Sequence, residues 1–154
     1  MRILDGLKIP YTAKEYADDG EHELKRGAAE KTAEKLGVDA ATVFKTIVMR
    51  TETKETVVFC QCALYEINLK KARNACNAKE VTPVKQEELL ALTGYIRGGC
   101  SPVGMKRKFR TFIDESALLH KTIHISAGVR GMQLEVAPAD LIKAADAVTV
   151  DLQL

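Results

Sequence analysis

The sequence lacks any apolar run that approaches the roughly 20 residues of a membrane-spanning helix. The N-terminus, MRILDGLKIP, reaches charged residues too early to contain the apolar centre of a signal peptide. Internal repeats, low-complexity tracts and linkers are missing as well. With 46% hydrophobic and 29% charged residues, the composition is typical of a folded globular domain. We therefore expect one cytoplasmic domain over residues 1–154 with no membrane partner.

Metal-ligand spacing is also missing. Cys60 and Cys62 are two residues apart on an expected strand, Cys76 and Cys100 are isolated, and no CxxC pair occurs. The three histidines form no ligand spacing with them, whereas a zinc site needs about four well-placed ligands. We therefore expect neither a metal nor another cofactor, and we interpret Cys60, Cys62 and Cys76 as small buried residues.

Several catalytic signatures are absent. The sequence has no Gly-x-Ser-x-Gly elbow and no GxxxxGK[ST] phosphate loop. A Ser-His-Asp triad is recognised by geometry rather than by order, so three histidines leave it open without supporting it. The remaining chemistry is that of a lysine and of a glycine-rich turn.

Sequence patterns predict both helices and strands. The strands at 43–50 and 55–63 pair naturally across the polar turn TETK. Helices are expected at 3–7, 26–37, 69–76, 85–93 and 138–145, and further strands at 12–17, 79–81, 110–114, 122–127, 132–136 and 147–154. The strands cluster late and without regular βαβ alternation. This pattern favours an α+β (mixed α/β) fold, with a curled, mostly antiparallel mixed sheet or barrel surrounded by helices.

Some local signals are more detailed. Asn68 is expected to cap the helix at 69–76, whose buried stripe would contain Leu69, Ala72 and Cys76. Gly94 should end the helix at 85–93. The strict alternation of AVTVDLQL predicts a final strand with one buried face.

Lys45 has unusual neighbours. It stands in the apolar stretch TVFKTIV and shares a strand face with Ile47 and Met49. Such a lysine either extends outward to water or points into a pocket. In a pocket, its ammonium group would hold an oxyanion, an ester carbonyl or a phosphate.

The turn GGCSPVG, residues 98–104, offers matching chemistry. Gly98 and Gly99 allow backbone N–H groups to approach a ligand closely, and Pro102 stiffens the turn. Consecutive N–H groups in such turns bind anions, although most Gly-Pro turns are only turns. A second small-residue stretch, SAGVRG at 126–131, is a candidate for the opposing wall.

Basic residues follow this turn directly. Between residues 97 and 110 the sequence has five basic residues and no acidic one, although the net charge of the chain is only +2. A run of this kind is commonly a solvated face. It is otherwise a binding surface for phosphates.

Four motifs together resemble one family. VFKTIV, TGYIRGGCSPVGMKRKFRTFIDES, IHISAGVRGMQLEV and PADL occur in the order and with the spacing of the YbaK/ProX aminoacyl-tRNA editing domains, over essentially the whole chain. The resemblance, which extends to the YbaK/EbsC branch, implies a trans-editing deacylase that removes a wrong amino acid from the acceptor end of a tRNA. In the cysteine-directed branch the substrate is Cys-tRNA(Pro), and prolyl-tRNA synthetase is a candidate partner.

The resemblance also implies roles for individual residues. Lys45 matches the essential lysine, and Thr46 matches its partner. The implied contacts to the aminoacyl group are Tyr16, Gly98, Gly99, Cys100, Ser101, Pro102, Ser126 and Gly128. The implied contacts to tRNA phosphates are Lys106, Arg107, Lys108 and Arg110.

The implied mechanism needs no general base from the protein. In cysteine-directed members the substrate's own thiol attacks its ester, so that the enzyme has only to orient it. Lys45 and the backbone donors of residues 98–101 would stabilise the developing charge.

Three alternatives remain open. An alanine-directed deacylase would use a bound water, and a relative without catalysis would only bind tRNA or a nucleotide. Cys100 could itself be the nucleophile if its thiol were exposed and its pKa lowered. Gln133 and Ala127 depart from the pattern of the family and bear on the identity of the amino acid.

Overall fold

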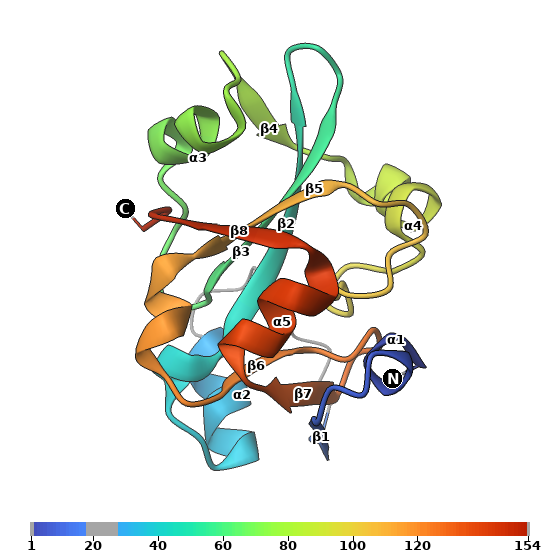
Figure 1. The fold of residues 1–154 in the computed structure, drawn as a ribbon, viewed down its shortest axis with the longest axis vertical. Helices are drawn as coiled ribbons and strands as arrows, with labels where there is room; N and C mark the ends of the chain where they lie inside the picture. The colour runs from blue at the N-terminus through green and yellow to red at the C-terminus, as the bar shows by residue number, and fades with distance from the viewer. Residues whose placement is uncertain (1, 18–27, 154) are drawn as a thin grey trace.

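The computed structural model describes residues 2–17 and 28–153 (Figure 1). Its α-helices are α1 (Arg2–Gly6), α2 (Ala28–Leu36), α3 (Leu69–Cys76), α4 (Gln86–Thr93) and α5 (Pro138–Ala145), with short 3₁₀ helices η1 (Ala40–Thr42) and η2 (Glu115–Leu119). Its strands are β1 (Thr12–Glu15), β2 (Phe44–Thr51), β3 (Thr56–Cys62), β4 (Val81–Pro83), β5 (Arg110–Asp114), β6 (Ile123–Ser126), β7 (Met132–Val136) and β8 (Ala147–Val150).

The described strands form two sheets. One has the order β1-β7-β6 and the other β4-β2-β3-β5-β8. Only the pairs β3–β5 and β5–β8 are parallel within these sheets. A single bridge between Val43 and His124 joins the start of β2 to β6. The predicted α+β fold with a mostly antiparallel, curled sheet is therefore confirmed, but the sheet does not close into a barrel.

Local sequence signals explain the ends of the helices. Asn68 caps α3 by accepting a hydrogen bond from Lys71 N, as predicted. Gly94 ends α4 in the left-handed region, at φ 83°. Pro138 opens α5, where its missing N–H removes no helical hydrogen bond. The start predicted for the helix at 26–37 lies outside the described residues.

Strand β2 separates two cores. Successive strand side chains point to opposite faces, so β2 directs Met49 into the core beneath α3 and Val48 into the core beneath α4. Figure 1 shows α3 and α4 on either side of the end of β2 that pairs with β4. Burial of each large apolar side chain stabilises this arrangement by about 1.5–3 kcal/mol.

One prediction of burial was wrong, and another holds only for the end of the chain. Leu69 is 45% exposed, because it stands at the first turn of α3 rather than over the core, whereas Ala72 and Cys76 are buried as expected. The last strand, β8, is shorter than predicted, and its Val148 is 56% exposed, whereas Val150 and the fully buried Leu152 of the predicted face pack into the core beneath α3. Val148 is exposed because β8 is the outermost strand of its sheet.

Candidate functional site

The backbone of β2 has an open edge. Val43 O accepts a hydrogen bond from Ala63 N at the end of β3, whereas Val48 O accepts one from Val84 N on the opposite side. Backbone groups alternate along a strand, so the N–H and C=O of Thr46 point away from β3. Among the described strands none pairs with this edge between the Val43–His124 bridge and the start of β4 pairing at Met49.

A pocket of about 520 Å³ lies along this open edge. Most of its lining is apolar and comes from β2, from the start of α3, from β4 and from α4. Its charged lining residues are Lys45, Glu66 and Arg97, and Thr46 and Cys100 line it as well. The volume lies in the range of ordinary small-molecule sites, about 300–1,000 Å³.

Lys45 and Thr46 reach this pocket from opposite faces of β2. Lys45 is half-buried, opposite Gln61 of β3. Thr46 is 7% exposed, and its buried Oγ1 has no hydrogen-bond partner among the described residues. A buried hydroxyl of this kind is normally satisfied by water or by a ligand.

The turn 98–104 is held by its backbone conformation and by burial. Gly98 has φ 86° and Gly104 has φ 76°, values that favour glycine. Ser101 is fully buried, and its Oγ accepts a hydrogen bond from Val103 N at 3.3 Å. Cys100 is 2% exposed and packs against Val48 and Val58. The burial of Cys100 removes the exposure on which its role as a nucleophile depended.

The second turn, 126–131, packs against the first. A Cβ on Gly99 would lie 3.2 Å from Val129 Cα and 3.3 Å from Arg130 N. Ser126 Oγ accepts a hydrogen bond from Gly128 N at 3.2 Å. The two small-residue stretches are therefore in direct contact through their backbones, and no side chain fits between them at Gly99.

Tyr95 holds both turns together. Its Oη donates to Val103 O at 2.6 Å, and its ring occupies the space where Gly128, at φ 103°, would carry a Cβ. Burial raises the pKa of Tyr95, so the phenol keeps its proton and remains a donor. Sequence reasoning did not assign this residue, although it stands in the motif TGYI. Tyr16 adjoins the same region, because its N donates to Gly131 O at 2.9 Å.

The pocket thus brings together only part of the predicted site. Lys45, Thr46 and Cys100 line it. The other predicted contacts do not line it and form or adjoin the two packed turns behind Cys100: Tyr16, Gly98, Gly99, Ser101, Pro102, Ser126 and Gly128.

Two charged lining residues were missed. Glu66 supplies the only carboxylate among the described residues of the pocket lining, and nothing in its sequence context indicated this. Arg97 donates from Nη1 to Gln86 Oε1 at 3.3 Å, and its buried Nε has no partner among the described residues. Its position directly before Gly98 was the available signal.

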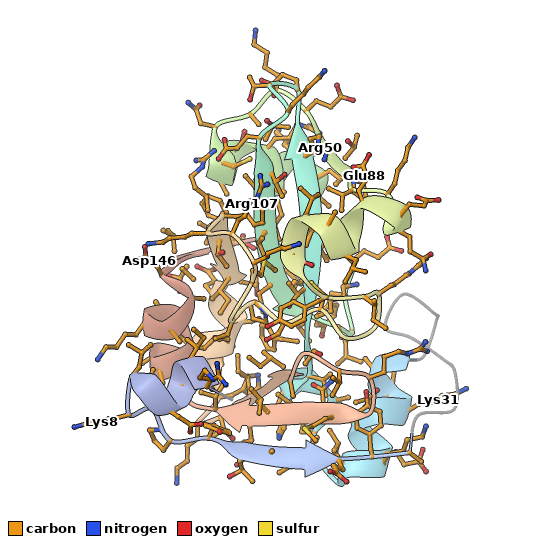
Figure 2. The ribbon with its side chains drawn as sticks, turned by 90° about the vertical axis from the view of Figure 1, so that its right-hand side faces the viewer. Lys8, Lys31, Arg50, Glu88, Arg107 and Asp146 are labelled. Carbon is orange, nitrogen blue, oxygen red and sulfur yellow. The ribbon has the colours of Figure 1, made fainter. Side chains whose placement is uncertain are left out.

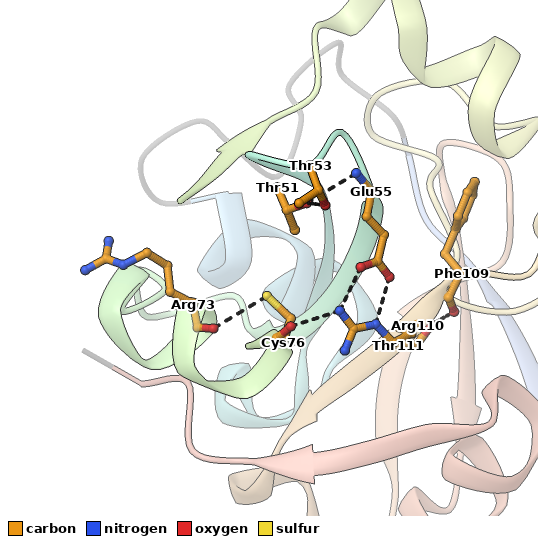
Figure 3. Close-up of polar contacts among 8 residues, drawn as sticks. All are labelled: Thr51, Thr53, Glu55, Arg73, Cys76, Phe109, Arg110 and Thr111. Atoms are coloured by element: carbon orange, nitrogen blue, oxygen red, sulfur yellow. Dashed lines mark hydrogen bonds and ion pairs between the residues drawn. The ribbon is translucent and has the colours of Figure 1, made fainter. Parts of the chain in front are cut away.

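The basic run divides into two kinds of residue. Arg110 Nε and Nη2 hold both carboxylate oxygens of Glu55, at 2.7 and 2.8 Å, and Nη2 also donates to Cys76 O (Figure 3). Lys108 forms an exposed ion pair with Asp146 at 2.7 Å. Lys106 and Arg107 are exposed and form no ion pair within residues 2–17 and 28–153. Arg107 is labelled in Figure 2, as is Asp146, the partner of Lys108.

A polar chain around the buried His124 lies beside the start of β2. Lys14 Nζ contacts Glu135 Oε2 at 2.6 Å, the same oxygen lies 3.0 Å from His124 Nε2, and His124 Nδ1 lies 2.9 Å from Thr42 Oγ1. Burial lowers the pKa of His124, against the opposing effect of Glu135. The hydrogen bond from Lys14 lowers the pKa of Glu135. None of these four residues lines the pocket.

The helices within the described part of the chain are all too short or too polar to cross a membrane.

Comparisons with known proteins identify the family. Residues 22–144 match the aminoacyl-tRNA editing domain. The chain is 40% identical, over 92% of its length and 84% of the relative's, to a protein of Enterococcus faecalis named "Putative Cys-tRNA(Pro)/Cys-tRNA(Cys) deacylase EbsC". It is also 33% identical over 47% of its length to a proline–tRNA ligase of Brachyspira hyodysenteriae, of which the match covers 12%.

A solved structure has the same fold. It is described as "a putative trans-editing enzyme for prolyl tRNA synthetase" and superposes with a TM-score of 0.82 at 21% identity, covering 94% of this chain and 87% of the other. The family predicted from the sequence motifs, and with it an enzyme of aminoacyl-tRNA editing, is therefore confirmed. The open-edged strand, the two packed turns and the sequence matches lead to one conclusion: the chain belongs to the aminoacyl-tRNA editing domain family.

Proposed function

We propose that this protein is a trans-editing deacylase that removes cysteine from tRNA(Pro). The observation that carries the proposal is the position of Lys45 and Thr46 at the open edge of β2, on a largely apolar pocket of the size of a small ligand. The name of the E. faecalis relative supports cysteine as the amino acid and tRNA(Pro) or tRNA(Cys) as its carrier. Editing is needed because the pocket of a synthetase discriminates between two amino acids that differ by one methylene by only about 1–3 kcal/mol.

The proposed reaction is an intramolecular displacement. The substrate's thiol sulfur attacks its own ester carbonyl, the bond from that carbon to the ribose 3′ oxygen breaks, and the thiol proton ends on the ribose oxygen. The cyclic thioester that forms is then hydrolysed by water. The enzyme contributes orientation, which is worth a large part of the barrier in well-aligned intramolecular reactions.

Lys45 supplies the positive charge in this mechanism. The carbonyl oxygen becomes negative as the sulfur attacks, and an ammonium group in an apolar pocket stabilises that charge more strongly than water does. The Thr46 hydroxyl, which lacks a partner within the described part of the chain, and the Thr46 backbone N–H, which points to the open edge of β2, are suited to hold the ester beside it.

The exposed part of the basic run would contact the acceptor stem. Lys106 and Arg107 are the residues best suited to meet phosphates, because Lys108 and Arg110 already contact Asp146 and Glu55. Phosphate contacts of this kind make the affinity for tRNA fall as salt rises.

The lining carboxylate supports a second candidate. Glu66 could activate a water, which would permit an alanine-directed deacylase without a substrate thiol. A relative that only binds tRNA is the third possibility, and it predicts no turnover at all.

One experiment separates these functions. Cys-tRNA(Pro), Ala-tRNA(Pro) and S-methylcysteinyl-tRNA(Pro) are incubated with the protein, and loss of each ester is measured. We expect rapid loss of the cysteine ester alone, because methylation removes the nucleophile and changes the size little. Faster loss of the alanine ester, or equal loss with and without the S-methyl group, would favour a bound water. Binding without loss of any ester would contradict the enzyme.

A further inference from the structure

Arg97 carries a polar group that the chemistry proposed above does not use. Its side chain lines the pocket, its Nη1 donates to Gln86 Oε1, and its buried Nε has no hydrogen-bond partner among the described residues. A buried guanidinium N–H without an acceptor costs free energy unless water or a ligand supplies one. The Nε–H of Arg97 therefore needs an acceptor that the described residues do not supply.

The shape of the guanidinium selects the kind of acceptor. The planar Nε/Nη2 edge matches two oxygens of a carboxylate or a phosphate. Arg110 uses this same edge to hold both oxygens of Glu55 (Figure 3). No carboxylate of residues 2–17 or 28–153 occupies this edge of Arg97, so the acceptor expected there is an anion of the bound substrate.

An aminoacyl-tRNA offers only one kind of anion near its ester. The amino group of the aminoacyl moiety is neutral or positively charged and never negatively charged, so it is not the anion that the guanidinium needs. The phosphates of the acceptor end are the remaining charged groups.

The neighbourhood of Arg97 continues toward the basic run. A Cβ on Gly94 would lie 3.7 Å from Lys106 Cβ, and Lys106 N donates to Thr93 O at 2.9 Å. Arg97 follows Gly94 by three residues and therefore lies at most about 11 Å from it along the chain. Positive charge thus extends from the pocket wall to the exposed residues Lys106 and Arg107.

We propose that Arg97 binds the 5′-phosphate of the terminal adenosine and thereby sets how far the ester enters the pocket. The inference rests on the proposed function for its ligand. It adds a phosphate subsite inside the pocket to the contacts of the exposed basic run. Lys45 then meets the ester at one end of the terminal nucleotide, and Arg97 meets the phosphate at the other.

The test compares ligands that differ only in this phosphate. Binding of adenosine 5′-monophosphate and of adenosine is measured by NMR titration with the wild-type protein, Arg97→Gln and Arg97→Lys. We expect the monophosphate to bind about 10- to 100-fold more tightly than adenosine to the wild type, the span that charged hydrogen bonds commonly cover. Arg97→Gln should abolish this difference, and Arg97→Lys should restore part of it.

Arg73→Gln is the matched control, because it removes the same charge from α3 outside the pocket lining; the Arg73 side chain is drawn in Figure 3. It should leave the ratio of the two affinities within about twofold, because Arg73 does not line the pocket and salt screens a charge that does not contact the ligand. A wild-type ratio near one, or equal losses for both ligands in Arg97→Gln, would overturn the phosphate subsite. Because binding is measured without turnover, a failure of deacylation would contradict only the proposed function.

Discussion

At the scale of single residues, the open edge of β2 explains how Lys45 and Thr46 can serve one site. Neighbours on a strand point to opposite faces, so a sheet with partners on both sides would separate them. The pocket extends around the unpaired edge and is lined by residues of both faces, Lys45 and Ile47 on one and Thr46 and Val48 on the other. The adjacent residues Lys45 and Thr46 can therefore contact one ligand because none of the described strands pairs with this edge of β2.

Lys45→Ala should lower the single-turnover rate of Cys-tRNA(Pro) deacylation on the order of a hundredfold, because it removes a donor to the charge that develops in the transition state. Lys70→Ala, an exposed position on α3, is the control and should retain the wild-type rate. Equal melting temperatures would show that both variants fold. A Lys45→Ala rate within about threefold of wild type would contradict the assigned role.

At the scale of elements, the two glycine-containing turns depend on each other. Gly99 meets the backbone of the second turn, and Tyr95 fills the space beside Gly128 while it binds Val103 O. The turns are therefore one packed unit rather than two separate loops. This unit places Cys100 and Arg97 at the pocket, so its distortion should reach the site without removal of any lining residue.

Gly99→Val should destabilise the protein by about 1–3 kcal/mol, because the new side chain meets backbone atoms at 3.2–3.3 Å that cannot rotate away. Chemical denaturation measures this loss. Gly6→Val is the control: nothing lies within 4 Å of a Cβ at Gly6, so its stability should stay within about 0.5 kcal/mol of wild type. Equal effects of the two substitutions would show that the turns do not pack as described.

At the scale of the whole molecule, the polar chain of Lys14, Glu135, His124 and Thr42 connects the three-stranded sheet to η1, directly before the start of β2. It joins β1, β7, β6 and η1, and the Val43–His124 bridge connects it to the strand that carries Lys45. The chain is favourable while His124 is neutral, because burial opposes its charged form.

The stability of the protein should consequently depend on pH. The pKa of His124 is lowered from its ordinary 6.5 in the folded state, so the unfolded chain binds this proton first. The contribution of His124 to the free energy of unfolding is fully present above pH 6.5 and is lost as the pH drops below that value. The lowered pKa of Glu135 adds a separate loss below its ordinary 4.5.

Melting temperatures are measured between pH 8 and 4. The wild type should show the loss of stability just below pH 6.5. The control variant His120→Gln should show it too, because among the described residues His120 takes part in no comparable side-chain network. The fall just below pH 6.5 should be absent in His124→Gln, whereas the fall below 4.5 should remain. An unchanged profile in His124→Gln would show that this histidine does not carry the pH dependence.

The sequence by itself determined the local elements and the family. Asn68, Gly94 and Pro138 set helix boundaries through their own backbone chemistry, which requires no distant partner. The pairing of β2 with β3 followed from two apolar runs around a short turn. The four motifs in their order along the chain were sufficient to identify an aminoacyl-tRNA editing domain.

Only the tertiary structure decided which residues share the pocket. Glu66 lies on the connection between β3 and α3, and no local pattern indicates that this connection faces Lys45. The ion pair of Arg110 with Glu55, 55 residues away, likewise separates it from Lys106 and Arg107, with which it forms one run in the sequence. The physical reason is that propensities and caps act over a few residues, whereas strand order and side-chain burial depend on long-range packing that no single segment encodes.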